Sequence, residues 1–246
     1  GRPHEAARIL GGRPEARGVS VGLQVREALY WGGDTSAAVE AARWLVPLAA
    51  GATPRGEAGQ NHLQSLCTLA AWRLANGGYR YAESAALRLR QAAVIGLDAN
   101  DSIAVSHYKT KCAALLEASR AAALRLPQAW TALEEADDAA RAYETGQSLG
   151  ANLVVARLAE AQGNLPLALR AVRRRANGYG LEPPWYLSTF LREEGRLAAL
   201  TGDTAGAVRA YQHYLALRPH PEPEVIGEVN RVRAELTRLM RKQSRQ

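Results

Sequence analysis

The stretch Gly33-Asp34-Thr35-Ser36-Ala37-Ala38-Val39-Glu40-Ala41 recurs near the other end of the chain as Gly202-Asp203-Thr204-Ala205-Gly206-Ala207-Val208-Arg209-Ala210. In both copies a glycine and an aspartate precede an alanine-rich run. Glycine readily takes the left-handed conformation that ends a helix, and an aspartate carboxylate accepts hydrogen bonds from free N–H groups at the start of the next helix. The stretch therefore predicts a helix–turn–helix unit that occurs more than once.

Similar turn signals divide the rest of the chain, at Asn76-Gly77-Gly78, Pro127 and Gly163-Asn164. Repeated helical hairpins at this spacing are typical of an α-solenoid. We expect residues 1–18 to be a linker, 19–222 to form the helical repeat array, and 223–246 to form a capping helix with a basic tail. The helices are expected over residues 19–31, 35–50, 61–75, 79–95, 102–126, 127–145, 151–162, 165–177, 184–200, 204–217 and 224–241.

The composition agrees with an all-α fold. The chain is 47% hydrophobic and 22% charged, and its apolar residues are mostly alanine and leucine, which favour helices. No uninterrupted apolar run approaches the ~18 residues that a transmembrane helix needs, so no membrane-spanning segment is predicted. The net charge of +7 is compatible with binding to nucleic acid or to an acidic surface but does not establish either.

The last hairpin resembles the tetratricopeptide repeat (TPR) family. The residues that match the family's helix-A glycine, small, aromatic and terminal-proline positions are Gly195, Ala207, Tyr211 and Pro219. The residues that depart from its usual Leu, Tyr and Ala are Glu194, Ala198 and Tyr214. The resemblance implies a TPR-like α-solenoid of about four to five helical hairpins with a C-terminal capping helix.

The segment Leu191–Leu217 and the closing helix also resemble the C-terminal helical tails of bacterial receptor-like Ser/Thr kinases and transcriptional activators. This resemblance implies a sensory or protein-binding module attached to a larger protein. The chain itself contains no Gly-rich phosphate loop, no kinase catalytic-loop motif and no Gly-x-Ser-x-Gly elbow. We therefore predict that it is not an enzyme, and we expect no cofactor.

The function that follows is a non-enzymatic scaffold or sensory domain that binds a protein or peptide partner. The TPR resemblance places Arg157, Arg192 and Arg196 on the helix-A positions that line the concave groove. Arg192 and Arg196 are four residues apart on one helix face, where two guanidinium groups can clamp a carboxylate. The alternative is that they are solvated charges beside Glu193 and Glu194.

Two alternative roles stay open at this point. The chain could be a structural accessory subunit of a larger complex, including a membrane-associated one. It could also be the regulatory part of a kinase or transcriptional regulator whose active domain lies outside this chain.

A basic run comprises Arg170, Arg173, Arg174 and Arg175. Its simplest explanation is a favourable interaction with the C-terminal dipole of a helix. The alternative is a patch for an acidic partner. Nucleic acid is an unlikely partner, because no interleaved exposed aromatic residues or recognition-helix motif accompany the run. The acidic stripe Glu134-Glu135-x-Asp137-Asp138 has no histidine at helical spacing and is interpreted as a solvated face.

Two cysteines occur in the same pattern, His62-x4-Cys67 and His107-x4-Cys112. The thiols could be small core residues, or they could form a disulfide that joins two hairpins, which would indicate an oxidising compartment. Equivalent positions on packed helices lie ~8–10 Å apart, whereas a disulfide needs Cα atoms within ~7 Å. We reject a metal site, because a five-residue step turns the ligands ~140° or more apart on a helix. The compartment, periplasmic or cytoplasmic, stays undecided.

Overall fold

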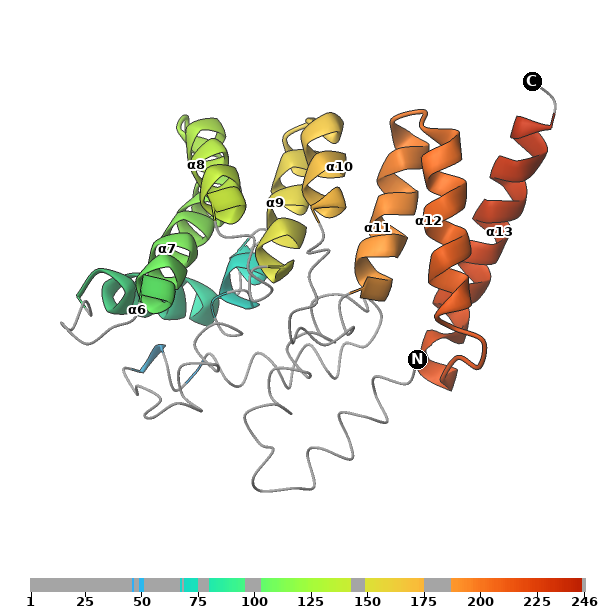
Figure 1. The fold of residues 1–246 in the computed structure, drawn as a ribbon. Helices are drawn as coiled ribbons and strands as arrows, with labels where there is room; N and C mark the ends of the chain where they lie inside the picture. The colour runs from blue at the N-terminus through green and yellow to red at the C-terminus, as the bar shows by residue number, and fades with distance from the viewer. Residues whose placement is uncertain are drawn as a thin grey trace.

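The computed structural model describes residues 46, 49–50, 67, 69–74, 80–95, 103–142, 149–174 and 187–244. Every regular element in these ranges is a helix, so the all-α prediction is confirmed for this part of the chain (Figure 1). The linker expected over residues 1–18 and the helix expected over 19–31 lie outside the described residues. The helices are α6 (Arg80–Ile95), α7 (Ile103–Ala123), α8 (Ala129–Ala142), α9 (Leu149–Ala161), α10 (Leu165–Arg173), α11 (Leu187–Leu200), α12 (Thr204–Ala216), the short 3-10 helix η4 (Pro223–Val225) and α13 (Ile226–Gln243).

The helices pack mainly against their neighbours in the chain. α6 contacts α7, α7 contacts α8, and the same holds for each following pair up to α12 and α13. In Figure 1 they stand in a row that runs from α6 and α7 on the left to α13 on the right. Small residues at the contacts, such as the fully buried Ala118, Ala168 and Ala207, let the helix axes approach closely.

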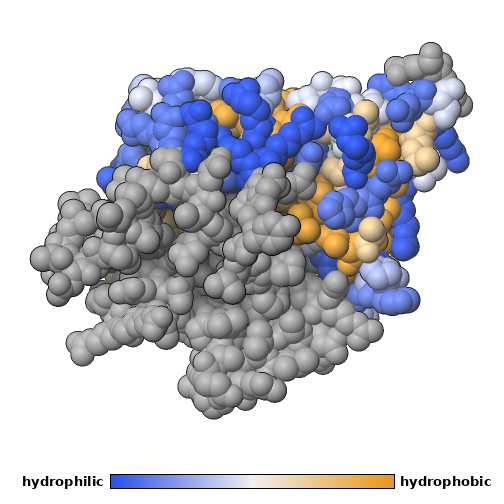
Figure 2. Space-filling view, viewed as in Figure 1, coloured by the Kyte–Doolittle hydropathy of each residue, from blue (hydrophilic) through white to orange (hydrophobic). Residues whose placement is uncertain are grey.

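The surface of the described part is mixed in character (Figure 2). Hydrophilic residues dominate the upper part of the face shown there, and hydrophobic residues reach the same face where α11 and α12 lie. No helix in the described ranges is both long enough and apolar enough to cross a bilayer.

The turns between α9 and α10 and between α11 and α12 have the predicted chemistry. Gly163 and Gly202 adopt φ values of 78° and 83°, the left-handed region that favours glycine. Asn164 Oδ1 then accepts a hydrogen bond from the Leu167 N–H at 3.0 Å, and Asp203 Oδ1 accepts one from the Gly206 N–H at 2.9 Å. Each side chain caps the helix that follows. The matching Gly33-Asp34 turn lies outside the described residues.

Helix α7 ends by the same geometry without a glycine. Arg125 takes a φ of 52°, and the Leu126 N–H donates to the Ala121 carbonyl at 2.9 Å. This bond closes the helix end, so the predicted helix over 102–126 stops at Ala123 and the helix predicted over 127–145 starts at Ala129. The helix predicted over 165–177 likewise ends early, at Arg173.

Helices α11 and α12 are in close contact where Gly195 faces Tyr211. A Cβ atom added at Gly195 would lie 2.9 Å from Cγ of Tyr211 and closer still to its Cδ1 and Cε1 atoms. The Tyr211 ring is buried, with 4% of its surface exposed, so it rests directly on the backbone of α11. The absence of a side chain at Gly195 is therefore a packing requirement of this helix pair.

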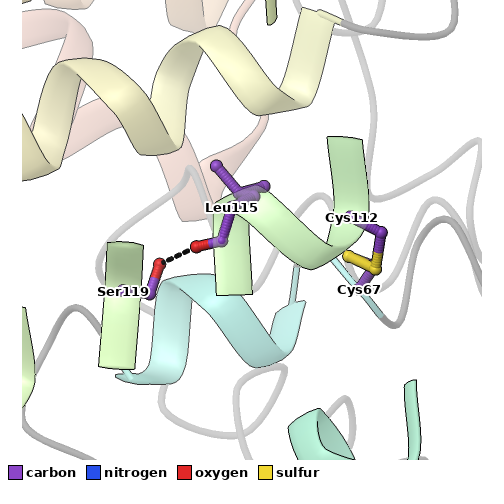
Figure 3. Close-up of a disulfide and its surroundings, with 4 residues drawn as sticks. All are labelled: Cys67, Cys112, Leu115 and Ser119. Carbon is purple, nitrogen blue, oxygen red and sulfur yellow. Dashed lines mark hydrogen bonds between the residues drawn. A yellow bond between two sulfur atoms is a disulfide. The ribbon is translucent and has the colours of Figure 1, made fainter. Parts of the chain in front are cut away.

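Cys67 and Cys112 form a disulfide (Figure 3). Their Cα atoms are 6.0 Å apart, closer than the general spacing of packed helices, and both residues are almost fully buried. Cys112 belongs to α7, and Cys67 comes from a segment of which residues 69–74 are helical. The bond therefore joins two segments 45 residues apart in sequence. The structure selects the disulfide from the alternatives that the sequence left open.

Candidate partner-binding groove

Two adjoining hollows follow the faces of α9, α11 and α13. The first, of about 220 Å³, lies between α9 and α11 and includes Arg157 in its lining. The second, of about 740 Å³, lies between α11 and α13 and includes Leu200. Both are lined by Arg192, Glu193 and Arg196, so they adjoin along α11, and we call the two together the charged groove. The structure thus brings together all three arginines that the sequence singled out.

The arginines of the charged groove are held by carboxylates of the protein itself. Arg196 donates two parallel hydrogen bonds to Glu160, from Nη1 to Oε1 at 2.6 Å and from Nη2 to Oε2 at 2.7 Å. Arg157 approaches the same carboxylate, with Nη1 3.4 Å from Oε2. The hydrogen bonds from Arg196 hold the pKa of Glu160 below its ordinary value. Glu160 therefore joins α9 to α11 through a two-point ion pair.

The ion pairs continue from α11 to α13. Glu193 lies between Arg192 and Arg196 and accepts from Arg196 Nε at 2.9 Å. Arg192 also pairs with Glu228 of α13, and the Tyr214 hydroxyl donates to Glu228 Oε1 at 2.5 Å. Burial raises the pKa of Tyr214, so this hydroxyl stays a donor. One network of charges therefore crosses three helices.

The network changes the interpretation of Arg192 and Arg196 as a carboxylate clamp. Their guanidinium groups already bind Glu160, Glu193 and Glu228, so a ligand carboxylate would share or displace these partners. A different cation, Arg231 of α13, lines the same groove, is exposed, and makes no ion pair with any residue that the structure describes. Sequence reasoning missed it because α13 was interpreted only as a cap.

Hydrophobic side chains line the charged groove between the ion pairs. Leu200 has 56% of its surface exposed at the end of α11, and the buried Val232 and Tyr211 line the groove nearby. Burial raises the pKa of Tyr211 to about 12, so its phenol stays neutral at physiological pH. The groove therefore combines an apolar surface with a charged rim.

Glu160→Gln should lower the free energy of unfolding at pH 7 by about 1 kcal/mol, because it removes the charge that pairs with Arg196 and Arg157. The pKa of Glu160 is lowered in the folded state, so its contribution is present above the unfolded value of about 4.3 and is lost as the pH falls through the folded value. Urea denaturation between pH 7 and pH 3 should therefore show a smaller loss of stability for the variant.

The matched control is Glu134→Gln, since Glu134 is exposed and makes no ion pair with the described residues. Equal effects of the two substitutions at pH 7 would contradict a stabilising role for the Glu160 pair.

Two arginines of the basic run are paired within the protein. Arg173 pairs with Glu194 of α11 at 3.2 Å and with Asp203 at 2.5 Å. Arg174 donates to Asp137 of α8 at 2.5 Å, and its Nε donates to Asn152 of α9 at 3.1 Å.

These two arginines therefore connect the end of α10 to the helices before and after it. Arg170 is exposed, and no ion pair to it is found among the described side chains. Arg175 lies outside the described residues.

Comparison of the chain with protein-family models, curated proteins and solved structures finds no match. In the part of the chain that the structure describes, no group of three or more His, Cys, Asp and Glu side chains is arranged to hold a metal ion.

Proposed function

We propose that this chain is a non-enzymatic, TPR-like α-solenoid that binds a segment of a partner protein in the charged groove, with α13 as the capping helix. The packing of helices in chain order supports the solenoid, as does the contact of Gly195 with Tyr211, two positions on which the TPR resemblance rests. The proposed array has about four to five helical hairpins.

The observation that carries this proposal is that two adjoining hollows place the charged groove along α9, α11 and α13. Its larger hollow, of about 740 Å³, has the size of a site for a ligand or a short peptide segment. The ion pairs through Glu160 and Glu228 fix the helices relative to one another. A rigid groove binds a partner with little loss of conformational entropy of its own.

The residues that remain available in the groove define the partner segment. Leu200 offers an exposed apolar contact, and Arg231 offers a cation that the described residues leave unpaired. A segment with an apolar side chain next to an acidic one complements both. Such amphipathic segments bind grooves either as helices or in extended form.

The disulfide supports an oxidising compartment for the protein. Buried disulfides persist outside the reducing cytosol, and Cys67 and Cys112 are both buried. We therefore favour the extracytoplasmic alternative over the cytoplasmic one.

A photo-crosslinking amino acid in place of Leu200 tests the groove directly in the native source. We expect it to capture a discrete partner, whereas the same group at Leu124, which is similarly exposed just after the end of α7, should not. Adding Arg231→Glu should reduce the crosslinked yield roughly fivefold, because reversing a rim charge costs about 1 kcal/mol.

The control is Arg233→Glu, an exposed arginine of α13 that does not line the groove. Equal capture from positions 200 and 124, or equal losses with both arginine variants, would rule out the charged groove as the binding surface.

A further inference from the structure

A third hollow, of about 720 Å³, lies between α8 and α10 and shares no lining residue with the two hollows of the charged groove. The wall from α8 includes Trp130, Glu134 and Asp138, and the wall from α10 includes Leu167 and Arg170. One helix therefore presents an aromatic and acidic surface, and the other presents a basic one. The acidic stripe and the basic run of the sequence meet at this place.

Most charges in this hollow are neutralised within the protein. Asp137 pairs with Arg174 at 2.5 Å, and Asp138 pairs with Arg141. Arg173 pairs with Asp203 and with Glu194 of α11. These pairs form fixed walls rather than sites for a ligand.

Glu134 and Arg170 are the exceptions. Both are exposed, both line the hollow, and neither makes an ion pair with the other or with any other residue in the described ranges. One unpaired anion and one unpaired cation thus lie on opposite walls of the same hollow. A ligand that carries both signs of charge would pair with each of them.

Trp130 adds an aromatic surface to the acidic wall. It lies four residues before Glu134 on α8, so the two side chains share a helix face. Its indole has 42% of its surface exposed and lines the hollow. The face of an indole attracts a Lys ammonium or Arg guanidinium group, and the adjacent carboxylate adds an ion pair. Across the hollow, the Arg170 guanidinium suits a carboxylate.

We propose that this hollow is a second binding site, for a peptide segment that carries a Lys or Arg side chain and a carboxylate a few residues away. The cation lies on Trp130 beside Glu134, and the carboxylate pairs with Arg170. The size of the hollow favours a peptide over a single small zwitterion, since sites of several hundred Å³ hold ligands of drug size. This site does not depend on the charged groove.

The test uses acetylated and amidated hexapeptides in which one Lys and one Glu are separated by one to four small neutral residues. Their affinity is measured by isothermal titration calorimetry, next to versions with norleucine in place of Lys or Gln in place of Glu. We expect the peptides with both charges to bind best, with a loss of about three- to tenfold for each charge removed.

Two variants then assign each charge to its wall. Glu134→Gln should abolish the preference for Lys over norleucine, and Arg170→Gln should abolish the preference for Glu over Gln, while each leaves the other preference in place. Trp130→Ala should weaken binding of the Lys peptides by about two- to fivefold. Glu135→Gln, an exposed neighbour on α8 outside the hollow, is the matched control and should change nothing.

Equal binding of charged and uncharged peptides by the wild-type protein would overturn the proposal, as would charge preferences that survive the two variants. Inhibition of peptide binding by millimolar glycine betaine would also contradict the proposal, because the ligand of the hollow would then be a small zwitterion and not a peptide. Arg231→Glu should leave this binding unchanged, so failure here and failure of the charged groove can be told apart.

Discussion

Replacing Cys67 and Cys112 together by alanine should lower the free energy of unfolding by about 4 kcal/mol. The bond closes a loop of 45 residues, and in the chain-entropy model a loop of that length removes about this much free energy from the unfolded state. The two side chains are small and buried, so their loss adds only a minor packing term. Urea denaturation of the oxidised protein and of the double variant measures the difference.

Reduction provides the control for this experiment. Wild-type protein unfolded and refolded in the presence of a thiol reductant should match the double variant, while the double variant should not respond to the reductant. A difference of less than about 1 kcal/mol between the oxidised and reduced forms would show that the bond does not constrain the unfolded chain as this model requires. It would also weaken the assignment to an oxidising compartment.

Gly195→Ala should lower the free energy of unfolding by about 2–3 kcal/mol, although alanine is the better helix former. The new methyl group would overlap the buried ring of Tyr211, and neither α11 nor the ring can move without disturbing the core. Thermal and urea denaturation give the magnitude. Because Arg192 and Arg196 are also on α11, displacement of this helix should weaken binding in the charged groove as well.

A second glycine in a helix serves as the matched control. Gly227 lies in the first turn of α13 with no atom within 4 Å of an added Cβ, so Gly227→Ala should be neutral or should stabilise the protein by up to about 1 kcal/mol. In the double variant Gly195→Ala/Tyr211→Leu, the ring that the new methyl group would overlap is gone. The double variant should therefore recover part of the lost stability, with a coupling energy of at least about 1 kcal/mol. If the changes in the free energy of unfolding of the two single variants simply added in the double variant, the new methyl group at residue 195 would not overlap the Tyr211 ring.

The turns were the most predictable part of this fold. Gly163-Asn164 and Gly202-Asp203 have the backbone angles and capping bonds that their residues predict, because each bond joins residues within a few positions of each other. The end of α7 was less predictable. Arg125 adopts a conformation that usually requires glycine, so nothing in its residue type indicated the turn.

The candidate sites were predictable only in part. Helical spacing placed Arg192 and Arg196 on one face, and the structure keeps them there. It did not indicate that Glu160, 36 residues away, holds Arg196, nor that Glu134 and Arg170 would line one hollow. Those facts depend on the offset and rotation of one helix against another.

The helical class, the capped turns at Gly163 and Gly202 and the charged residues on each helix face could all be predicted from the sequence, since backbone conformation and helical periodicity are local properties. The packing of the helices was needed to show which charges are neutralised, which remain available, and that Cys67 reaches Cys112. The pairing of side chains requires their atoms to come within a few ångströms, and that distance is set by how Ala-rich helices pack, not by the residues of either helix alone.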